Sequence, residues 1–417
     1  MWESLKTAFR IPELRKKMWW TVFLLAVFRL GSYIVVPGMS SFNLGEHSLF
    51  SLLDMFSGGA LSNMSLFALG VQPYITSSII MNLLTVVIPS WQELSKEGPE
   101  GRRVLARYTK YGTVILGLIQ ALAITLNFRA AMVDPTNMAS LFSIVVTMTA
   151  GTVFLTWLGE HISERGIGNG VSMLIFAGIV ARFVPSIIRT LQTVGEGGTR
   201  LFGLILFFIL TILVVVFVVI VTQGERKIPV QYAKRVVGRK MYGGQATHLP
   251  LRVNQVGVIP VIFASSVLAF PMTIAGFLSP ENGFYKFVQK YLYPGQLIYL
   301  VLYALFIFLF SYFYTAVTFN PMEVADNLKK YGGFIPGIRP GRPTAEYLDK
   351  ILTRITTAGA LFLTFIALLP YLLGPLTGIR QIGFGGTSLL IAVGVAIDTM
   401  KQIEAQLVMR QYEGFLK

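Results

Sequence analysis

The chain has 417 residues, of which 54% are hydrophobic and only 13% charged, yet its formal net charge is +15. Because soluble domains carry roughly a quarter charged residues, this composition excludes a disordered chain and argues against a soluble enzyme. It indicates a multi-spanning membrane protein with basic loops. The chain has no cysteine, which excludes disulfides, thiol catalysis and thiolate metal sites. Its three histidines are far apart and show no metal-ligand spacing: His47, His161 and His248.

Ten apolar stretches are long enough to cross a bilayer as helices, which takes about 20 residues. We expect the first to be retained and not cleaved as a signal peptide, because Arg29 interrupts it and no small-residue cleavage site follows. The sequence therefore predicts an all-α membrane protein with ten transmembrane helices. The predicted spans are 19–37, 65–90, 111–129, 140–159, 171–188, 201–222, 255–279, 297–319, 355–373 and 385–400.

The basic residues are distributed very unevenly between the two sides of these spans. One side carries 27 of the 35 Lys and Arg residues, the other side carries six, and two lie within spans. Since cytoplasmic loops are enriched in Lys and Arg, both termini are predicted to be cytoplasmic. They comprise an amphipathic N-terminus at 1–18 and a tail at 401–417.

The ten spans divide into two groups of five. The N-terminal half covers 19–190, the C-terminal half covers 201–400, and the connector 191–200 contains the flexible sequence GEGG. Because five is odd, the second half enters the membrane with the opposite polarity. This is the plan of an inverted repeat, although the two halves show no obvious sequence similarity.

Ionisable residues are scarce within the spans, where pumps usually carry them. Arg29, Arg182 and Asp398 lie within or at the ends of spans. Arg29 could be a functional charge, but we favour the interpretation that it pairs with a carboxylate or reaches the membrane surface. We expect Asp398 to mark the cytoplasmic end of the last span. No nucleotide-binding, metalloprotease or serine-hydrolase motif occurs. The sequence therefore predicts no catalytic residue, no metal site and no cofactor.

The segment 54–89 is irregular, with paired glycines and a proline at position 73. Two interpretations are open. A short piece around 56–64 could fold back into the protein, with the true span starting near Leu66, or the segment could be a proline-kinked helix after a loop. The span 255–279 holds the matching place in the second half and also carries prolines. Such paired segments indicate a central pathway, whereas the small residues near them are equally typical of close helix packing.

Two long loops on the basic side, 223–254 and 320–354, form a second signal. In the first, Gly-containing turns at 238–239 and 242–244 predict a hairpin. The second is rich in Gly and Pro over 332–343. Basic loops attract anionic lipid, nucleic-acid phosphate or acidic protein. Orientation alone does not require loops of this length, so we favour a docking platform over simple topology determinants.

Several long motifs resemble the SecY/Sec61-alpha family, the central channel subunits of protein translocases. The resemblance covers essentially the whole chain, and motifs of this length are specific. They are GGALSNMSLFALGVQPYITSSII (58–80), GERKIPVQYAKR (224–235), GRKMYGGQATHLPLRVN (238–254), GVIPVIFASSVLAFP (257–271), FNPMEVADNLKKYGGFIPGIRPGRPTAEYLDKILTRIT (319–356) and GGTSLLIAVGVAID (385–398).

The resemblance implies two five-helix halves around an hourglass pore that conducts unfolded secretory polypeptides. A ring of aliphatic side chains would form the constriction: Val71, Ile75, Ile175, Ile179, Ile262 and Ile391. Val71 departs from the isoleucine often found there. A plug would fill the external funnel: Phe56, Ser57, Gly58, Gly59, Ala60, Leu61, Ser62 and Asn63. A lateral gate between the second/third and seventh/eighth helices would release signal sequences and membrane segments into lipid: Thr76, Ser77, Ser78, Asn82, Ser265, Ser266 and Phe270.

The resemblance also implies partners in the bacterial plasma membrane: the subunits SecE and SecG, the SecA motor ATPase, the ribosome and precursor polypeptides, with anionic lipids around them. Docking residues would include Lys227, Arg239 and Lys240 toward ribosomal RNA, and Arg339 toward SecA, with Arg342 beside it. An alternative of another class, a secondary transporter for a small solute, predicts a compact polar site at mid-membrane. An intramembrane enzyme would need a catalytic constellation. Neither feature can be assembled from these residues.

Overall fold

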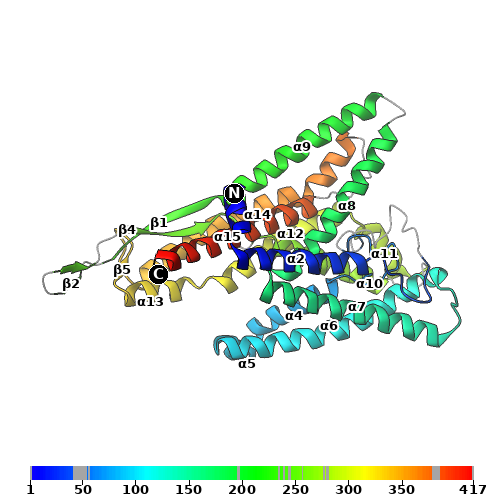
Figure 1. Cartoon of the computed structure of the whole chain (residues 1–417), viewed down its shortest axis with the longest axis horizontal. Coiled ribbons are helices and arrows are strands. Elements are labelled where there is room, and N and C mark those ends of the chain that lie inside the picture. Colours follow the sequence, from blue (N-terminus) through cyan, green and yellow to red (C-terminus); the bar gives the residue numbers. More distant parts are fainter. Residues whose placement is uncertain are drawn as a thin grey trace.

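A computed structural model gives the fold of the chain (Figure 1). The residues that it describes are 2–40, 54, 57–194, 198–232, 235–237, 240–242, 246–255, 257–275, 278, 281–377 and 386–415. Long helices dominate the molecule, and most of them run along its longest axis (Figure 1). A small sheet lies at one end, together with α13 (Pro321–Lys330). The short helix α11 (Gly283–Tyr291) lies toward the other end.

The N-terminal half begins with a short helix and continues with longer ones. Proline occupies the first turn of four of its helices, where a missing backbone donor costs nothing. The axis bends by 102° between α4 and α5, at Pro89. The helices are α1 (Trp2–Arg10), α2 (Pro12–Gly31), α4 (Gln72–Val87), α5 (Pro89–Lys96), α6 (Pro99–Asn127), α7 (Met138–Arg165) and α8 (Gly170–Val194), with a 3₁₀ turn, η1, at Arg129–Ala131.

The C-terminal half contains the remaining helices and all the strands. Its helices are α9 (Gly198–Gln223), α10 (Ile259–Ala275), α11, α12 (Leu297–Thr318), α13, α14 (Arg342–Thr377) and α15 (Gly386–Phe415). Its strands are β1 (Glu225–Tyr232), β2 (Arg235–Val237), β3 (Lys240–Tyr242), β4 (Ala246–Arg252) and β5 (Gly333–Phe334). Of the predicted 191–200 connector, residues 195–197 are outside the described residues.

Each of the ten predicted spans overlaps a helix, but length and hydropathy single out fewer of them. Four helical segments within the described residues are long and apolar enough to cross a membrane, or five if the bent α4–α5 pair is one span. The four are Pro99–Asn127, Met138–Arg165, Leu297–Lys330 and Arg342–Leu372. Shorter apolar helices lie at Gly170–Phe183, Phe208–Gln223 and Ile259–Ala275.

Large apolar side chains cover outward faces of these helices, as a lipid environment requires. On α9, for example, Ile209, Ile212, Leu213 and Ile220 are all more than half exposed. Exposed apolar surface of this extent marks an interaction with membrane or protein. The chain is therefore a multi-pass membrane protein.

One large apolar cluster joins the two halves. It draws residues from α2, α4, α7 and α8 in the first half and from α9, α10, α12, α14 and α15 in the second. Its centre includes the fully buried Tyr299 and Tyr303 of α12. Helices from both halves thus share one interior.

The two long basic loops form a single structural unit, which the sequence did not predict. Strand β1 pairs antiparallel with β4 and, on its other edge, with β5 from the second loop. A separate apolar core lies beneath this sheet, and Ile228, Leu251 and Leu348 are among its members. The predicted hairpin in 223–254 is confirmed, and β2 and β3 extend it. The prediction of an all-α protein must be amended by this sheet.

The two ends of the chain lie against each other. Helix α1 contacts α15, and Ala8, Leu14, Ile403 and Leu407 form a small buried cluster there. The backbone N–H of Gly168 donates to Gln402 Oε1 at 2.6 Å, so the turn after α7 packs on the same part of α15. This contact agrees with the predicted location of both termini on one side of the membrane.

Two predicted boundaries were wrong. The first span ends at Gly31 instead of residue 37, and the second helix starts at Gln72 instead of near Leu66. Four glycines with positive φ, at positions 38, 58, 59 and 70, break the chain between them. Such backbone angles suit glycine and terminate regular helix.

The shared core of the two basic loops can be tested by truncating Leu348, which is 0% exposed. Leu348→Ala is expected to cost about 2–5 kcal/mol of packing and to make both loops sensitive to protease, because one core supports both. Limited proteolysis at 223–254 and 320–354 measures this. Tyr331→Ala, at a side chain that is 79% exposed, is the control. Cleavage of one loop alone would contradict the shared core.

Candidate functional site

The six predicted ring residues come together in the large apolar cluster. Five of them are at most 8% exposed, and Ile262 is half-buried and packs against the same cluster. They come from α4 and its N-cap, α8, α10 and α15, so both halves contribute. The five are Val71, Ile75, Ile175, Ile179 and Ile391. We predict that these six side chains form an aliphatic ring between the halves, here called the collar.

Helix α8 carries the collar and a charge on one face. Ile175, Ile179 and Arg182 are spaced i, i+4 and i+7, which places them in one row along a helix. Arg182 is three positions after Ile179, which is about 4.5 Å along the helix axis. The guanidinium therefore starts directly beyond the apolar collar.

Residues 57–70, here called the plug segment, form a compact series of turns without a helix. Local backbone hydrogen bonds hold these turns together: Gly59 N donates to Asp54 O at 3.0 Å, and Ser65 N donates to Ala60 O at 2.9 Å. Leu66 N donates to Ile34 O at 2.8 Å, which ties the segment to the chain after α2. These contacts support the interpretation that a piece folds back into the protein, and Pro73 lies in the first turn of α4 instead of kinking a helix.

Most of the predicted plug residues are buried in this segment. Phe56 lies outside the described residues, whereas Ser57, Gly58, Ala60 and Leu61 are buried. Gly59, Ser62 and Asn63 are half-buried. The fully buried Leu61 packs with residues of α6 and α7 in a second apolar cluster. The segment is therefore packed as core, and not as an exposed loop.

Gly58 brings the plug segment against the backbone of α8. Its φ is +70°, and a Cβ at this position would lie 2.8 Å from Gly178 Cα and 3.1 Å from Gly178 O. Real Cβ atoms do not approach this closely, so neither the angle nor the space suits a side chain. Two glycines thus permit direct backbone contact between the plug segment and α8.

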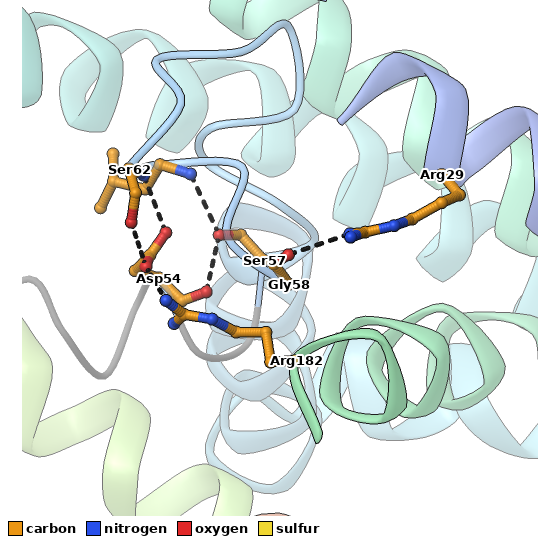
Figure 2. A network of polar contacts seen from close by, with 7 residues as sticks. Arg29, Asp54, Ser57, Gly58, Ser62 and Arg182 are labelled. Carbon is orange, nitrogen blue, oxygen red and sulfur yellow. Dashed lines mark hydrogen bonds and ion pairs between the residues drawn. The ribbon is translucent and has the colours of Figure 1, made fainter. Parts of the chain in front are cut away.

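A polar network fixes the same contact (Figure 2). Arg182 Nη2 lies 2.7 Å from Asp54 Oδ2, and the Asp54 side chain is only 3% exposed. Ser62 donates to both carboxylate oxygens, through its backbone N–H at 2.8 Å and through its hydroxyl. Ser57 Oγ donates to Asp54 O at 3.1 Å. Asp54 is the centre of the network.

Arg29 holds the plug segment from the side of α2 (Figure 2). Its Nη1 donates to the carbonyl of Gly58 at 3.1 Å, and its Nη2 donates to Tyr33 Oη at 2.6 Å. The guanidinium also lies 4.6 Å from the centre of the Tyr33 ring. Of the two predicted fates of Arg29, a carboxylate partner is not found among the described contacts, where the arginine instead binds a backbone carbonyl of the plug segment.

The contact between α4 and α10 is where the predicted gate residues meet. Gln72 Nε2 donates to Ser266 Oγ at 3.0 Å, a bond between the two halves that is buried. Beside it is a cavity of about 20 Å³ whose lining includes Thr76, Phe270 and Thr273. This volume holds about one water molecule. The interface is thus polar and imperfectly filled.

Not every predicted gate residue faces this contact. Ser77 is buried and donates to Thr109 O of α6 at 2.8 Å, so it packs α4 within its own half. Ser265 donates to Ile262 O of its own helix at 2.8 Å. Ser78 and Asn82 are half-buried on α4. Among the predicted gate residues, Thr76, Ser266 and Phe270 are those that the cavity brings together.

The predicted docking residues are spread over the sheet unit and its approaches. Lys227 is on β1 and lies 3.4 Å from Glu225 Oε1, with 62% of its side chain exposed. Arg339 is exposed between β5 and α14, and Arg342 is exposed at the start of α14. Lys240 is on β3, while Arg239 lies outside the described residues.

Three residues of the site were not predicted from the sequence: Asp54, Gln72 and Gly178. Asp54 is an acidic residue directly before a Gly-rich segment, and Arg182 is a charge inside an apolar helix. Both are costly in a membrane unless they are paired, so their pairing was a signal that could have been used. Gln72, a lone amide before Pro73, is the same kind of signal.

Comparisons with known proteins identify the family of the chain. The family model described as SecY matches residues 65–400. "Protein translocase subunit SecY" of Thermotoga maritima is 46% identical over 433 residues, which covers 100% of this chain and 98% of that protein. The subunit of the same name from Escherichia coli K12 is 46% identical over 421 residues, with 98% and 95% covered.

Solved structures show the same fold at lower identity. A structure described as a protein conducting channel has a TM-score of 0.69 at 20% identity, with 97% of each chain covered. Sec61 in the canine ribosome-channel complex has a TM-score of 0.65 at 19% identity, again with 97% of each chain covered. At this identity the likeness shows the fold alone.

The close approach at Gly58 predicts that Gly58→Ala displaces the plug segment from α8, because the added Cβ has no space. In a background with Ala60→Cys, whose site is 0% exposed in the native chain, the displacement should speed labelling by a membrane-impermeant maleimide. Gly332→Ala is the matched control, with a φ of +71° but nothing within 4 Å of its Cβ. Equal labelling of the Ala60→Cys protein alone, with Gly58→Ala and with Gly332→Ala would show that the plug segment tolerates the methyl group.

Proposed function

The chain belongs to the SecY family, and we propose that it is the channel subunit of a protein translocase, through which unfolded polypeptides cross the membrane. The observation that carries the proposal is the apolar cluster shared by both halves, which holds the predicted collar residues and against which the plug segment packs. The chain is a channel and not an enzyme. Relatives that are named translocase subunits, and that match this chain over nearly their whole length, support this assignment.

An aliphatic collar suits a cargo without a fixed sequence. Hydrated ions lose water at a narrow apolar constriction, and such constrictions close by dewetting. Isoleucine side chains adapt to whatever peptide fills the opening, while the plug segment blocks it at rest. A polar site would bind some sequences too tightly and would let ions pass.

The contact between α4 and α10 is our candidate for the lateral gate. It joins the halves through one buried side-chain hydrogen bond, Gln72 to Ser266, beside an unfilled cavity. A net hydrogen bond contributes only about 0.5–1.5 kcal/mol, so an apolar signal sequence that packs there offsets its loss. Signal sequences and membrane segments would leave through this contact into lipid.

The topology completes the proposal. Ten spans in two inverted halves would place the sheet unit, α1 and the end of α15 in the cytoplasm of a bacterial cell, with the plug segment on the outer side. The concentration of 27 basic residues on the first side supports this orientation. The plasma membrane is the compartment that such a bacterial chain would occupy.

The sheet unit would be the docking platform for the ribosome or for the SecA motor, since the chain carries no nucleotide motif of its own. Two loops joined by β1 and β5 present their basic residues on one unit. A relative of the same fold, Sec61, has been solved in a ribosome-channel complex. SecE and SecG would complete the complex on the apolar outer faces, with anionic lipids near the basic side.

The alternative function, a secondary transporter, has no support. Within the described residues, Arg29, Asp54 and Arg182 bind the plug segment and its surroundings and do not form a solute site. No group of acidic, histidine or cysteine residues suited to a metal occurs in the described parts of the chain. The relatives are translocase subunits.

The pore assignment predicts crosslinks from the collar to the cargo. The chain has no cysteine, so single cysteines at Ile75, Ile262 and Ile391 carry no background. Each should form a disulfide with a cysteine in a precursor stalled in transit, because the peptide passes within reach. Ile209→Cys, on the exposed face of α9, is the negative control. Failure of all three collar positions in an export-active complex would remove the pore from this place.

The docking assignment predicts that Arg339→Glu slows SecA-driven export by about tenfold or more, because the new charge repels an acidic partner and removes a hydrogen-bond donor. Export of a precursor into membrane vesicles measures it. Lys96→Glu makes the same charge change at an exposed site on α5 and should export normally. Normal export by Arg339→Glu would contradict the role given to this residue.

A further inference from the structure

The carboxylate of Asp54 is buried and depends on three donors. Its oxygens accept from Ser62 N–H, the Ser62 hydroxyl and Arg182 Nη2. Only the arginine brings a compensating charge. A buried ion that loses its partner is strongly destabilised, because neither water nor another charge replaces it. The Asp54–Arg182 pair is therefore the most costly contact to break in the polar network of Figure 2.

Both arginines that hold the plug segment come from the N-terminal half. Arg182 lies on α8 and Arg29 lies on α2, and within the described residues their side chains bind Asp54, Gly58, Ser32 and Tyr33. All of these residues precede α9. Among the described residues, the polar contacts of the plug segment thus lie within the first half.

The apolar packing of the plug segment is mainly with the first half, although Ala60 also belongs to the large cluster shared by both halves and Leu69 lines the small cavity beside α10. Leu61 and Met64 are 0% exposed and belong to the cluster formed with α6, α7 and the residues around η1. Gly58 contacts Gly178 of α8. The buried hydrogen bond between α4 and α10, from Gln72 to Ser266, involves none of these residues.

We infer that the Asp54–Arg182 pair is a latch that keeps the plug segment on the N-terminal half, so that opening of the α4–α10 contact leaves the pore blocked until this pair is broken. The inference rests on the proposed channel function. It adds the two residues that control release of the plug segment, after the α4–α10 contact has opened. Two barriers follow from two separate contacts: a weak neutral hydrogen bond at the gate and a buried charge pair at the plug segment.

This arrangement sets different energy barriers for leaving the channel sideways into lipid and for crossing the membrane. A membrane segment needs only the lateral contact to part, so it can enter lipid while the latch stays closed and ions remain excluded. A secreted polypeptide must also displace Asp54 from Arg182. The chain therefore separates insertion from translocation by the strength of two contacts.

The test uses the complete translocase complex in liposomes, with Ala60→Cys as a reporter of the plug segment. Asp54→Asn keeps the shape of the side chain and can still accept from Ser62, but it loses the charge. Arg182→Gln removes the other charge. Each single change should raise ion leak and maleimide labelling of Ala60→Cys by about tenfold or more. The double variant should be no worse than the singles, because coupled partners are not additive.

A variant at the α4–α10 contact should have the opposite effect: faster insertion with no change in leak or labelling. Ser266→Ala leaves the buried amide of Gln72 without its partner, so it should speed insertion of a membrane segment while leak and labelling stay at the native level. Lys110→Gln removes a partly exposed pair, Lys110–Glu160 at 2.8 Å, and should change none of the readouts. Export of an ordinary precursor shows that each variant folds.

Two results would overturn the latch. In the first, Asp54→Asn and Arg182→Gln export normally and show native leak and labelling. In the second, Ser266→Ala raises leak as much as Asp54→Asn does, which would mean that the plug segment moves with the gate. These two results are distinct from a failure of the proposed channel function. In that case the unmodified complex itself would not export a precursor.

Discussion

Backbone groups at membrane depth must find hydrogen-bond partners within the protein, because hydrocarbon offers none. The plug segment is the place where this constraint is most demanding, since it has no helix to satisfy it. Its N–H and C=O groups bond within the segment, to the chain after α2, and to Arg29. The helices around it are arranged so that this unusual piece of backbone stays buried.

The polar and apolar parts of the site have separate tasks. In the proposed channel, the collar would exclude water and ions without recognising a sequence, and its aliphatic side chains suit that task. The charges are kept beyond it, where Arg182 follows Ile179 along one face of α8 and binds Asp54. A charge inside the collar would hydrate the opening. The same charge one turn further holds the plug segment in place.

The sequence predicted the helices better than the contacts between them. Apolar length and basic loops located every long helix, because burial in lipid imposes composition directly. The start of α4 was placed too early, since turn formation at Gly58, Gly59 and Gly70 depends on left-handed backbone angles that hydropathy does not report. The joining of β1 to β5 and the pairing of Asp54 with Arg182 involve residues more than 100 positions apart, which no local pattern encodes. The collar residues were found only through a family resemblance.

The central claim is that a polypeptide passes through the collar after Asp54 and Arg182 separate. A structure of the complete complex with a secretory precursor stalled in transit tests it most directly. The account predicts an extended peptide between Ile75, Ile179 and Ile391, with Asp54 and Arg182 beyond hydrogen-bonding distance. A peptide that crosses the membrane elsewhere, with the collar closed and the pair intact, would contradict it.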